Sequence, residues 1–408
     1  MQYKGILLIL VIPLLISVSC SSRISETENL PLTKSPVEYI FQVAETEQFK
    51  ITPTFTPTII DEVERKPVLS TTTPSAKPVD TGVCCSTINF QPWELITSIE
   101  WSQDGRYLII SAGTVIYIYD VESQQFIGSY KVKALTHTLD ISQNGEWLVS
   151  GSRDGVIRVW QFDQMIDNLA AGKDMPPVYQ IDAHKRGINS VSFVNPDEYL
   201  ASAGNDGIIR IWDVATRQQI SSMIGGNYAV PCIAYSPKYD IVAIANNDIV
   251  RLRNLQTIQI EGTLRAPTNL YSIAFNPYGN LIVAGDLTNY LYIWNIDDVY
   301  RTQAENYSQP LIKLGLGANG NNYEGLVWQV KFHPSGKVIA SAGGDHSVRL
   351  WDVITGDLLD EFNGHSAGVS SIAFHPDGNI LVSGGLDGIL NFWKIVLPDA
   401  MIQGDTGF

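Results

Sequence analysis

The sequence has little positive charge. Its 408 residues include 27 Lys and Arg against 42 Asp and Glu, which gives a formal net charge of −15 at pH 7. A nucleic-acid-binding protein needs basic surface to neutralise phosphates, so this balance argues against nucleic acid as a partner. The same charge is repelled by anionic lipid surfaces.

Residues that carry common enzyme chemistry are also scarce. The six His have no spacing typical of metal ligands on one strand or helix. No nucleophilic serine motif, phosphate-binding loop or Cys–His pair stands out. The segment 315–320 has the glycine spacing of a dinucleotide site, but a loop and not a helix follows it. We therefore expect no catalytic residues, no metal and no cofactor.

Near the N-terminus, the apolar run from Gly5 to Val18 is too short for a transmembrane helix, which needs about 20 residues. It follows a positive start and has the length of a signal-peptide core. The run ends in Ser19 and Cys20, and this pattern resembles a bacterial lipoprotein signal. The resemblance implies removal of residues 1–19, a lipid on Cys20, and an extracytoplasmic, membrane-anchored protein in a bacterial cell envelope. Ser17 stands where that family prefers Leu, and an ordinary secretory signal is the alternative.

Residues 21–83 differ in composition from the rest of the chain. They contain no Trp and one Gly, and they are rich in Thr, Pro, Ser and Glu. Such a segment buries too little apolar area to offset its chain entropy. We expect residues 20–83 to form a lipidated, disordered tether. Cys84 and Cys85 follow directly and fit a strained disulfide, a bond to a partner or two free thiols.

A motif with fixed spacing recurs in the remaining chain. In four clear copies an Asp follows a Ser by four residues and precedes a Trp by six. The copies are Ser150, Asp154 and Trp160; Ser202, Asp206 and Trp212; Ser341, Asp345 and Trp351; and Ser383, Asp387 and Trp393. Such regularity indicates a repeat architecture.

One apolar residue in the strand before each motif aligns seven repeats, which are about 40 to 57 residues apart. These residues are Ile99, Leu139, Val191, Ile233, Ile273, Val330 and Ile372. Four short strands in each repeat predict an all-β, seven-bladed β-propeller over residues 84–397, followed by a tail over 398–408. The last blade lacks its outer strand, so a strand from another part of the chain is needed to close the ring.

These motifs resemble the WD40 repeat family. In that family the N-terminal strand completes the last blade, so the resemblance implies that residues 86–91 supply the missing strand and close the ring. The resemblance implies that a His, a Ser, an Asp and a Trp tie each complete blade together. Two blades match all four positions, with His184, Ser202, Asp206 and Trp212, and with His365, Ser383, Asp387 and Trp393. The copies that begin at Ser150 and Ser341 are partial. Tyr119 and Arg253 replace the Trp in blades one and four.

The same resemblance implies a non-enzymatic, monomeric platform for protein–protein interaction, with the partner docked on one face of the ring. The candidate partner-binding residues are Trp328, Tyr271, His137, Asn189, Arg153, Asn205, Lys185 and Arg186. Trp328 and Tyr271 would serve as aromatic anchors, although packing on a neighbouring loop is the alternative. Two insertions, 163–175 and 297–309, predict short helices on the opposite face. The alternative function is an enzyme, or a binder of a small ligand or carbohydrate, that uses the central channel.

Overall fold

The computed structural model describes residues 84–91, 94–174, 176–226, 229–302, 310–315, 326–398 and 401. The predicted signal peptide, Cys20 and the tether lie outside the described residues, as do the side chains of Cys84 and Cys85. Neither helix in the described part of the chain has the length and apolar character that crossing a membrane requires.

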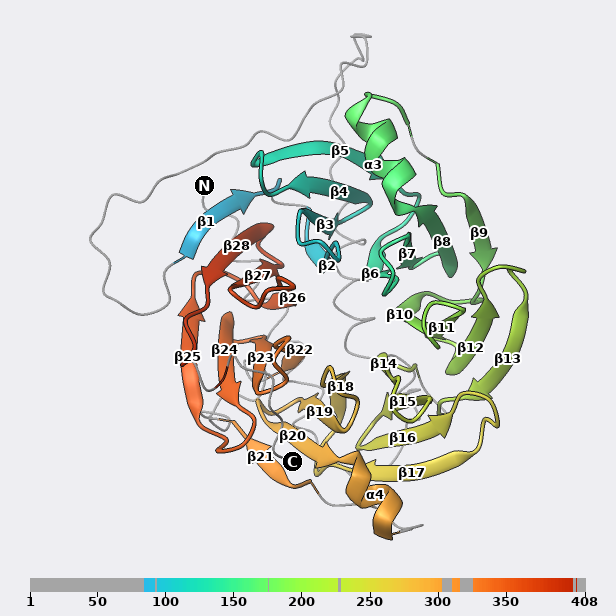
Figure 1. Cartoon of the computed structure of the whole chain (residues 1–408), viewed down its shortest axis with the longest axis vertical. Coiled ribbons are helices and arrows are strands. Elements are labelled where there is room, and N and C mark those ends of the chain that lie inside the picture. The colour runs from blue at the N-terminus through green and yellow to red at the C-terminus, as the bar shows by residue number, and fades with distance from the viewer. Residues whose placement is uncertain are drawn as a thin grey trace, which may run out of the picture. The chain divides into compact units, whose positions relative to one another are not determined.

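Seven four-stranded antiparallel sheets surround a common centre, so the predicted seven-bladed propeller is confirmed (Figure 1). The first strand of each blade lies nearest the centre. Blades 1 to 4 are formed by β2 (Ile96–Trp101), β3 (Tyr107–Ala112), β4 (Val115–Asp120) and β5 (Gln125–Lys131); β6 (Thr136–Ile141), β7 (Trp147–Ser152), β8 (Val156–Gln161) and β9 (Tyr179–Asp182); β10 (Ile188–Val194), β11 (Tyr199–Gly204), β12 (Ile208–Asp213) and β13 (Gln219–Ile224); and β14 (Cys232–Ser236), β15 (Ile241–Asn246), β16 (Ile249–Asn254) and β17 (Ile260–Arg265). Blades 5 to 7 are formed by β18 (Leu270–Phe275), β19 (Leu281–Asp286), β20 (Leu291–Asn295) and β21 (Ile312–Leu314); β22 (Val327–Phe332), β23 (Val338–Gly343), β24 (Ser347–Asp352) and β25 (Leu358–Asn363); and β26 (Val369–Phe374), β27 (Ile380–Gly385), β28 (Ile389–Lys394) and β1 (Cys84–Asn89).

The ring is closed by the first strand of the described chain. β1 pairs antiparallel with β28, from Cys84 opposite Trp393 to Asn89 opposite Ile389. Closure by this segment was predicted, although the strand begins and ends two residues earlier than expected. Pairing the two ends gives blade 7 four strands, like every other blade. The strand edge of β28 is therefore covered by β1.

The tight turns between first and second strands follow from their Pro and Gly residues. In blade 7, Gly378 adopts a φ of +80° and its N–H donates to the His375 carbonyl at 2.8 Å. Glycine is needed there because the left-handed region is unfavourable for other residues. The His333 ring of blade 6 also occupies the space that a β-carbon would take.

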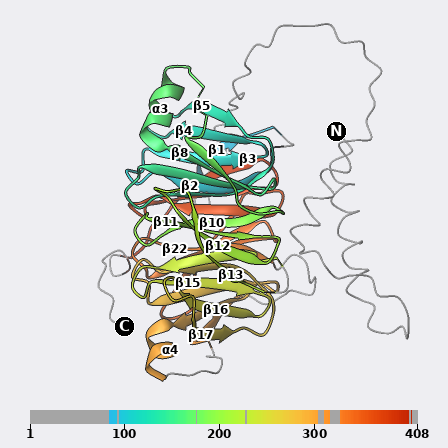
Figure 2. The same cartoon turned by 90° about the vertical axis from the view of Figure 1, so that its right-hand side faces the viewer.

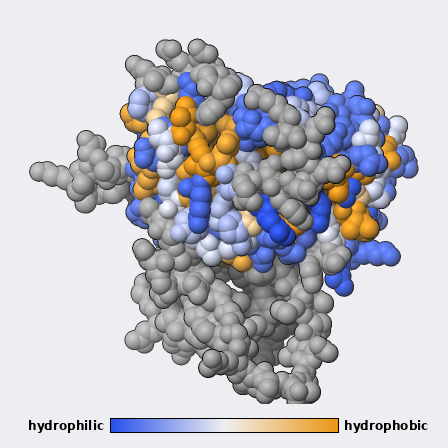
Figure 3. Space-filling view, turned by 90° about the horizontal axis from the view of Figure 1, so that it is seen from below, coloured by the Kyte–Doolittle hydropathy of each residue, from blue (hydrophilic) through white to orange (hydrophobic). Residues whose placement is uncertain are grey.

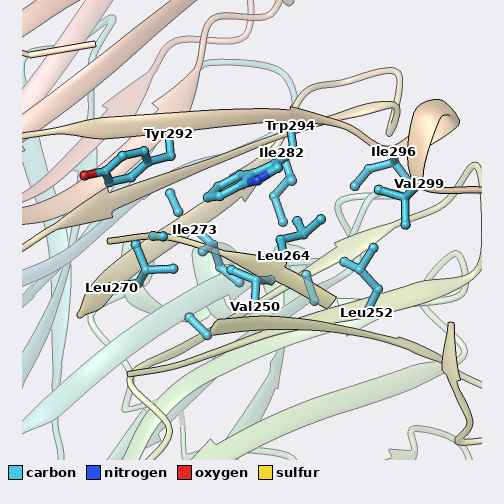
Figure 4. Close-up of a cluster of buried hydrophobic side chains, with 14 of the residues drawn as sticks. Val250, Leu252, Leu264, Leu270, Ile273, Ile282, Tyr292, Trp294, Ile296 and Val299 are labelled. Atoms are coloured by element: carbon cyan, nitrogen blue, oxygen red, sulfur yellow. The ribbon is translucent and has the colours of Figure 1, made fainter. Parts of the chain in front are cut away.

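The hydrophobic core lies between blades. Seven buried clusters are present in the described chain, one at each contact between neighbouring blades. Figure 4 shows the cluster between blades 4 and 5, where Val250 and Leu264 face Ile273 and Trp294. Each blade therefore depends on both neighbours to bury its faces, as in other repeat proteins.

Two helices follow third strands, as the insertions predicted. α3 (Phe162–Ala170) buries Phe162, Met165, Ile166 and Leu169 against blades 1 and 2. α4 (Ile296–Thr302) adds Ile296 and Val299 to the cluster between blades 4 and 5. Third strands end on the opposite face from second strands, and Figure 2 shows both helices on one side of the ring. We call this side the lower face, and the side where inner strands begin the upper face.

The outer edge of the ring carries some apolar surface. On blades 4 to 6, Ile260, Leu311, Ile354 and Leu358 are between 38% and 57% exposed. Figure 3 views the ring from this edge and shows apolar patches among hydrophilic side chains. Scattered apolar side chains of this kind are normal on soluble domains, so we assign them no role.

Candidate partner-binding face and central channel

The structure places all eight candidate partner-binding residues on the upper face. His137, Asn189, Tyr271 and Trp328 lie near the starts of four inner strands. The other four, Arg153, Lys185, Arg186 and Asn205, lie in the loops that follow second strands or precede inner strands of blades 2 and 3.

Several residues at this repeat position connect adjacent blades. Thr97 donates to the Thr136 carbonyl at 2.5 Å, His137 Nδ1 contacts the Ile188 carbonyl at 3.0 Å, and Asn189 donates to the Val230 carbonyl at 3.0 Å. Ser370 completes the series with the Ile96 carbonyl. We call these contacts the upper belt. His137 and Asn189 thus have a structural task that the sequence did not reveal.

The state of His137 agrees with this task. Burial lowers the pKa of His137 to about 4, so its ring is neutral at physiological pH. A neutral ring with its proton on Nδ1 donates to the Ile188 carbonyl.

The upper belt is interrupted on three consecutive blades. Pro231, Tyr271 and Trp328 stand at the same position in blades 4, 5 and 6. Proline has no side-chain donor, and the two aromatic rings are too large to repeat the short contact made by Thr or Asn. The upper belt is therefore formed by polar contacts on blades 1, 2, 3 and 7, while apolar or aromatic side chains stand at its position on blades 4, 5 and 6.

Tyr271 and Trp328 are both half-buried on the neighbouring strands β18 and β22. Burial raises the pKa of the Tyr271 hydroxyl, which stays protonated. The ring of Trp328 lies beside Gly368, in the loop that leads into β26 of blade 7. It therefore packs on a neighbouring loop. Its indole N–H, however, has no hydrogen-bond acceptor among the described residues.

A second series of contacts lies one residue further along each inner strand. There a polar side chain accepts a hydrogen bond from the backbone N–H of the next blade's inner strand, and the series continues around all seven blades. We call it the middle belt, and its acceptors are Ser98, Thr138, Ser190, Cys232, Ser272, Gln329 and Ser371. The seven donors are the N–H groups of the apolar residues that aligned the repeats.

Contacts of the same kind continue on the lower face. His333 Nε2 lies 3.1 Å from the Gly378 carbonyl, and His375 Nε2 lies 3.1 Å from the Gly105 carbonyl. These two His are repeat positions that join successive blades.

Among the described residues, no group of His, Cys, Asp or Glu is arranged to hold a metal ion.

The four-residue network of blade 3 forms a continuous chain of hydrogen bonds. Trp212 Nε1 donates to Ser202 Oγ at 2.9 Å, and Ser202 lies 2.9 Å from His184 Nε2. His184 Nδ1 lies 2.9 Å from Asp206. Burial lowers the pKa of His184, which favours the neutral ring with its proton on Nδ1.

The Asp206 carboxylate is stabilised in its charged form. Partial burial raises the pKa of Asp206, but hydrogen bonds from His184 and Arg210 outweigh burial and leave the pKa below its usual value. Blade 7 has the same arrangement, with Trp393, Ser383 and His365 leading to Asp387. Burial raises the pKa of Asp387, but hydrogen bonds from His365 and from the backbone outweigh burial and leave this pKa below its usual value.

Blades 2 and 6 stabilise the same Asp with an arginine. Arg158 lies 2.5 Å from Asp154, and Arg349 lies 2.7 Å from Asp345. In blade 3, Arg210 supplements the His. The sequence analysis missed these arginines, although each follows its Asp by four residues. In blade 6, Trp351 Nε1 donates to Ser341 Oγ at 2.9 Å. In blade 2, Val132 stands at the His position and is buried.

We expect Asp206→Ala to lower the free energy of unfolding by about 1–3 kcal/mol, because it leaves His184 and Arg210 without their acceptor. Urea denaturation measures this loss. Asp182→Ala, which removes an exposed carboxylate, is the control and should shift the midpoint little. An unchanged midpoint for Asp206→Ala would contradict a structural role.

The inner strands carry a charged cluster that the sequence analysis did not find, and we call it the channel cluster. Lys331 of blade 6 lies 2.9 Å from Glu100 of blade 1, and the two strands are separated by β26 of blade 7. Asp140 of blade 2 interacts with both charges and accepts the Phe193 N–H at 2.7 Å. These three residues occupy one repeat position, directly after the apolar residues that aligned the repeats. At that position Ala373 of blade 7 leaves room for the Lys331–Glu100 contact.

Burial and neighbouring charges shift the pKa values of two residues in this cluster. Burial and the Glu100 carboxylate raise the pKa of Asp140 to about 7. Burial alone would lower the pKa of Lys331, but Glu100 outweighs it and raises the pKa above its usual value. Lys331 thus stays charged, while Asp140 exchanges its proton near neutral pH.

The blade geometry agrees with a comparison with known proteins. A family model described as "WD domain, G-beta repeat" matches residues 124–161, 175–213, 258–295, 318–352 and 356–394. These five segments are WD40 repeats. The matched segments contain Trp160, Trp212, Trp294, Trp351 and Trp393, whereas blades 1 and 4, with Tyr119 and Arg253, are not matched as repeats.

WD40 proteins of eukaryotes are among the similar sequences. Serine-threonine kinase receptor-associated protein of Homo sapiens is 23% identical over 241 residues, covering 59% of this chain and 61% of the relative. WD repeat-containing protein slp1 of Schizosaccharomyces pombe is 25% identical over 273 residues, covering 64% of this chain and 50% of the relative. The alignments thus span about half to three fifths of the relatives' own length.

Proposed function

We propose that the protein is a monomeric, non-enzymatic platform that binds a protein partner on the upper face of its propeller. A WD40 propeller is typical of interaction scaffolds, and one relative is itself named as receptor-associated. The observation that carries the proposal is the interruption of the upper belt at Pro231, Tyr271 and Trp328. Half-buried aromatic side chains at an interruption of the upper belt are suited to act as binding anchors.

We expect Trp328→Ala to weaken partner binding at least tenfold, or about 1.4 kcal/mol. The partner would first be isolated by pull-down from membrane extract and then titrated against folded variants. Tyr300→Ala is the control, because Tyr300 lies on α4 of the lower face, where it stacks on Tyr239. Equal losses in both variants, or no loss in Trp328→Ala, would rule out the upper face as the binding site.

We also propose that a lipid on Cys20 anchors the protein to the outside of a bacterial membrane. The apolar run that ends at Ser19 and Cys20 supports this proposal. Two acyl chains on one residue suffice for stable anchoring, whereas a single chain binds only reversibly. We expect Cys20→Ala to move the protein from the membrane fraction to the soluble fraction. Retention of the variant in salt-washed membranes would refute the anchor.

The channel cluster supports a second candidate, a small-ligand site at Glu100, Asp140 and Lys331. A carboxyl group with a pKa near 7 is common in functional sites. The cluster's own contacts favour a structural task, since Lys331 and Glu100 bind each other and Asp140 binds the backbone of blade 3. If Asp140→Asn and Lys331→Met abolish a ligand-dependent rise in melting temperature during a metabolite screen, the second candidate is preferred.

A further inference from the structure

Four cations lie together on the upper face of blades 2 and 3. Lys133, Lys185 and Arg186 are exposed, and Arg153 is half-buried. We call these four residues the cation patch. Three of its members, Arg153, Lys185 and Arg186, were candidate binding residues, while Lys133 was not.

Backbone contacts bring the loops of the cation patch together. The Arg153 N–H donates to the Leu135 carbonyl at 2.8 Å, which joins it to the loop that carries Lys133. Gly187, directly after Arg186, packs on the backbone of Arg153, and its carbonyl accepts the Asn205 N–H at 2.9 Å. The patch is therefore held by the frame of the two blades.

The carboxylates of these loops are already neutralised. Asp154 is bound by Arg158, and Asp206 is bound by Arg210 and His184. Lys133, Lys185 and Arg186 make no ion pair within the described part of the chain. Asp182, at the end of β9, is an exposed carboxylate three residues before Lys185. Cations thus outnumber available carboxylates at this site.

Two cations of other blades on the upper face are paired. Arg265 lies 3.2 Å from Asp248 in blade 4, and Arg349 lies 2.7 Å from Asp345 in blade 6. The cation patch therefore stands out on a protein whose net charge is −15. That net charge repels extended polyanions such as membranes or nucleic acid, whereas a short acidic segment responds mainly to charges within about 10 Å.

We propose that the cation patch docks an acidic peptide segment of the protein partner. This inference rests on the proposed function and adds the chemistry of the partner. Carboxylates of the segment would pair with Lys133, Lys185 and Arg186, and rim charges of this kind mainly set specificity and the rate of association.

The test uses the full chain and labelled ten-residue peptides in which Ser alternates with Glu, Gln or Lys. Fluorescence anisotropy at low salt should show binding of the Glu peptide alone, with weaker binding as salt increases. The double variant Lys185→Glu and Arg186→Glu should lower its affinity at least tenfold. The matched control is Lys173→Glu with Lys394→Glu, which changes the net charge equally on the lower face and should alter affinity less than twofold.

Equal loss in the two double variants, or full binding by the patch variant, would overturn the proposal. So would stronger competition for the patch by phosphatidylglycerol vesicles than by the Glu peptide. The isolated partner separates the two proposals. If Trp328→Ala abolishes partner binding and the patch variant does not, the interaction platform stands and the acidic segment is wrong. If neither variant affects partner binding, the proposed binding face itself fails.

Discussion

Trp393→Ala is expected to lower the free energy of unfolding by about 3–5 kcal/mol, the usual cost of truncating a large buried aromatic residue. Trp393 is 2% exposed in the cluster between blades 6 and 7. Its ring stacks on Phe362 with centroids 5.1 Å apart, and its Nε1 donates to Ser383 at 2.8 Å. It also lies in β28, the strand that β1 must pair with to close the ring.

A second substitution separates packing from hydrogen bonding at this residue. Trp393→Phe keeps a ring against Phe362 but removes the donor to Ser383, and we expect a smaller loss of about 1–2 kcal/mol. Lys394→Ala, on the exposed neighbour, serves as the surface control. Urea denaturation measures the unfolding free energies of the three variants, and an unchanged m-value shows that only stability has changed. A loss from Trp393→Ala no larger than that from Trp393→Phe would contradict the packing argument.

Asp140→Asn is expected to stabilise the protein at pH 8 and to have little effect at pH 4. The folded pKa of Asp140 is raised to about 7 from a reference value of 3.8. Between these values the folded state holds a proton that the unfolded state releases, so stability falls as pH rises from about 4 to about 7. Asparagine cannot ionise, and its carbonyl oxygen still accepts the Phe193 N–H.

The size of this effect follows from the shift in pKa. One pKa unit corresponds to about 1.4 kcal/mol, so the full shift sets a limit near 4 kcal/mol. Solvent screening of the partly exposed carboxylate reduces the expected gain to about 1–3 kcal/mol. The measurement is the difference in unfolding free energy between the variant and the native protein from pH 4 to pH 8. Taking the difference removes contributions from His137 and other groups. A difference that does not change with pH would show that Asp140 titrates normally.

The blades were predictable because their signals are local. Alternating apolar residues, Pro-Gly turns and the spacing of Ser, Asp and Trp lie within about 40 residues of one another, and they indicated seven blades. The closing strand was predictable because blade 7 lacked an outer strand and because, in the WD40 family that the motifs resemble, the N-terminal strand completes the last blade. Its bounds were two residues off, since strand ends depend on pairing that local sequence does not specify.

The belts and the channel cluster depend on how neighbouring blades are aligned. Thr97 and Ser98 look like ordinary strand residues until the next blade places a carbonyl or an N–H beside them. A signal was present for the channel, because Glu100, Asp140 and Lys331 share one repeat position. Their interaction across Ala373 requires the curvature of the closed ring, which no single repeat encodes. The aromatic residues Tyr271 and Trp328 were visible because they depart from a polar column.

Closure by β1 has a consequence for protein synthesis. The ribosome makes β1 about 300 residues before β28, which at roughly 5–20 residues per second leaves it without its partner for about 15 to 60 seconds. Within that interval the unpaired β1 can add to blade 7 of another copy whose synthesis is more advanced, giving a strand-exchanged dimer. A chain's own β1 is favoured because it is covalently linked to the ring and so has a higher local concentration. Crowded translation of one messenger RNA should therefore increase exchanged dimers, while slow, dilute expression should yield closed single rings.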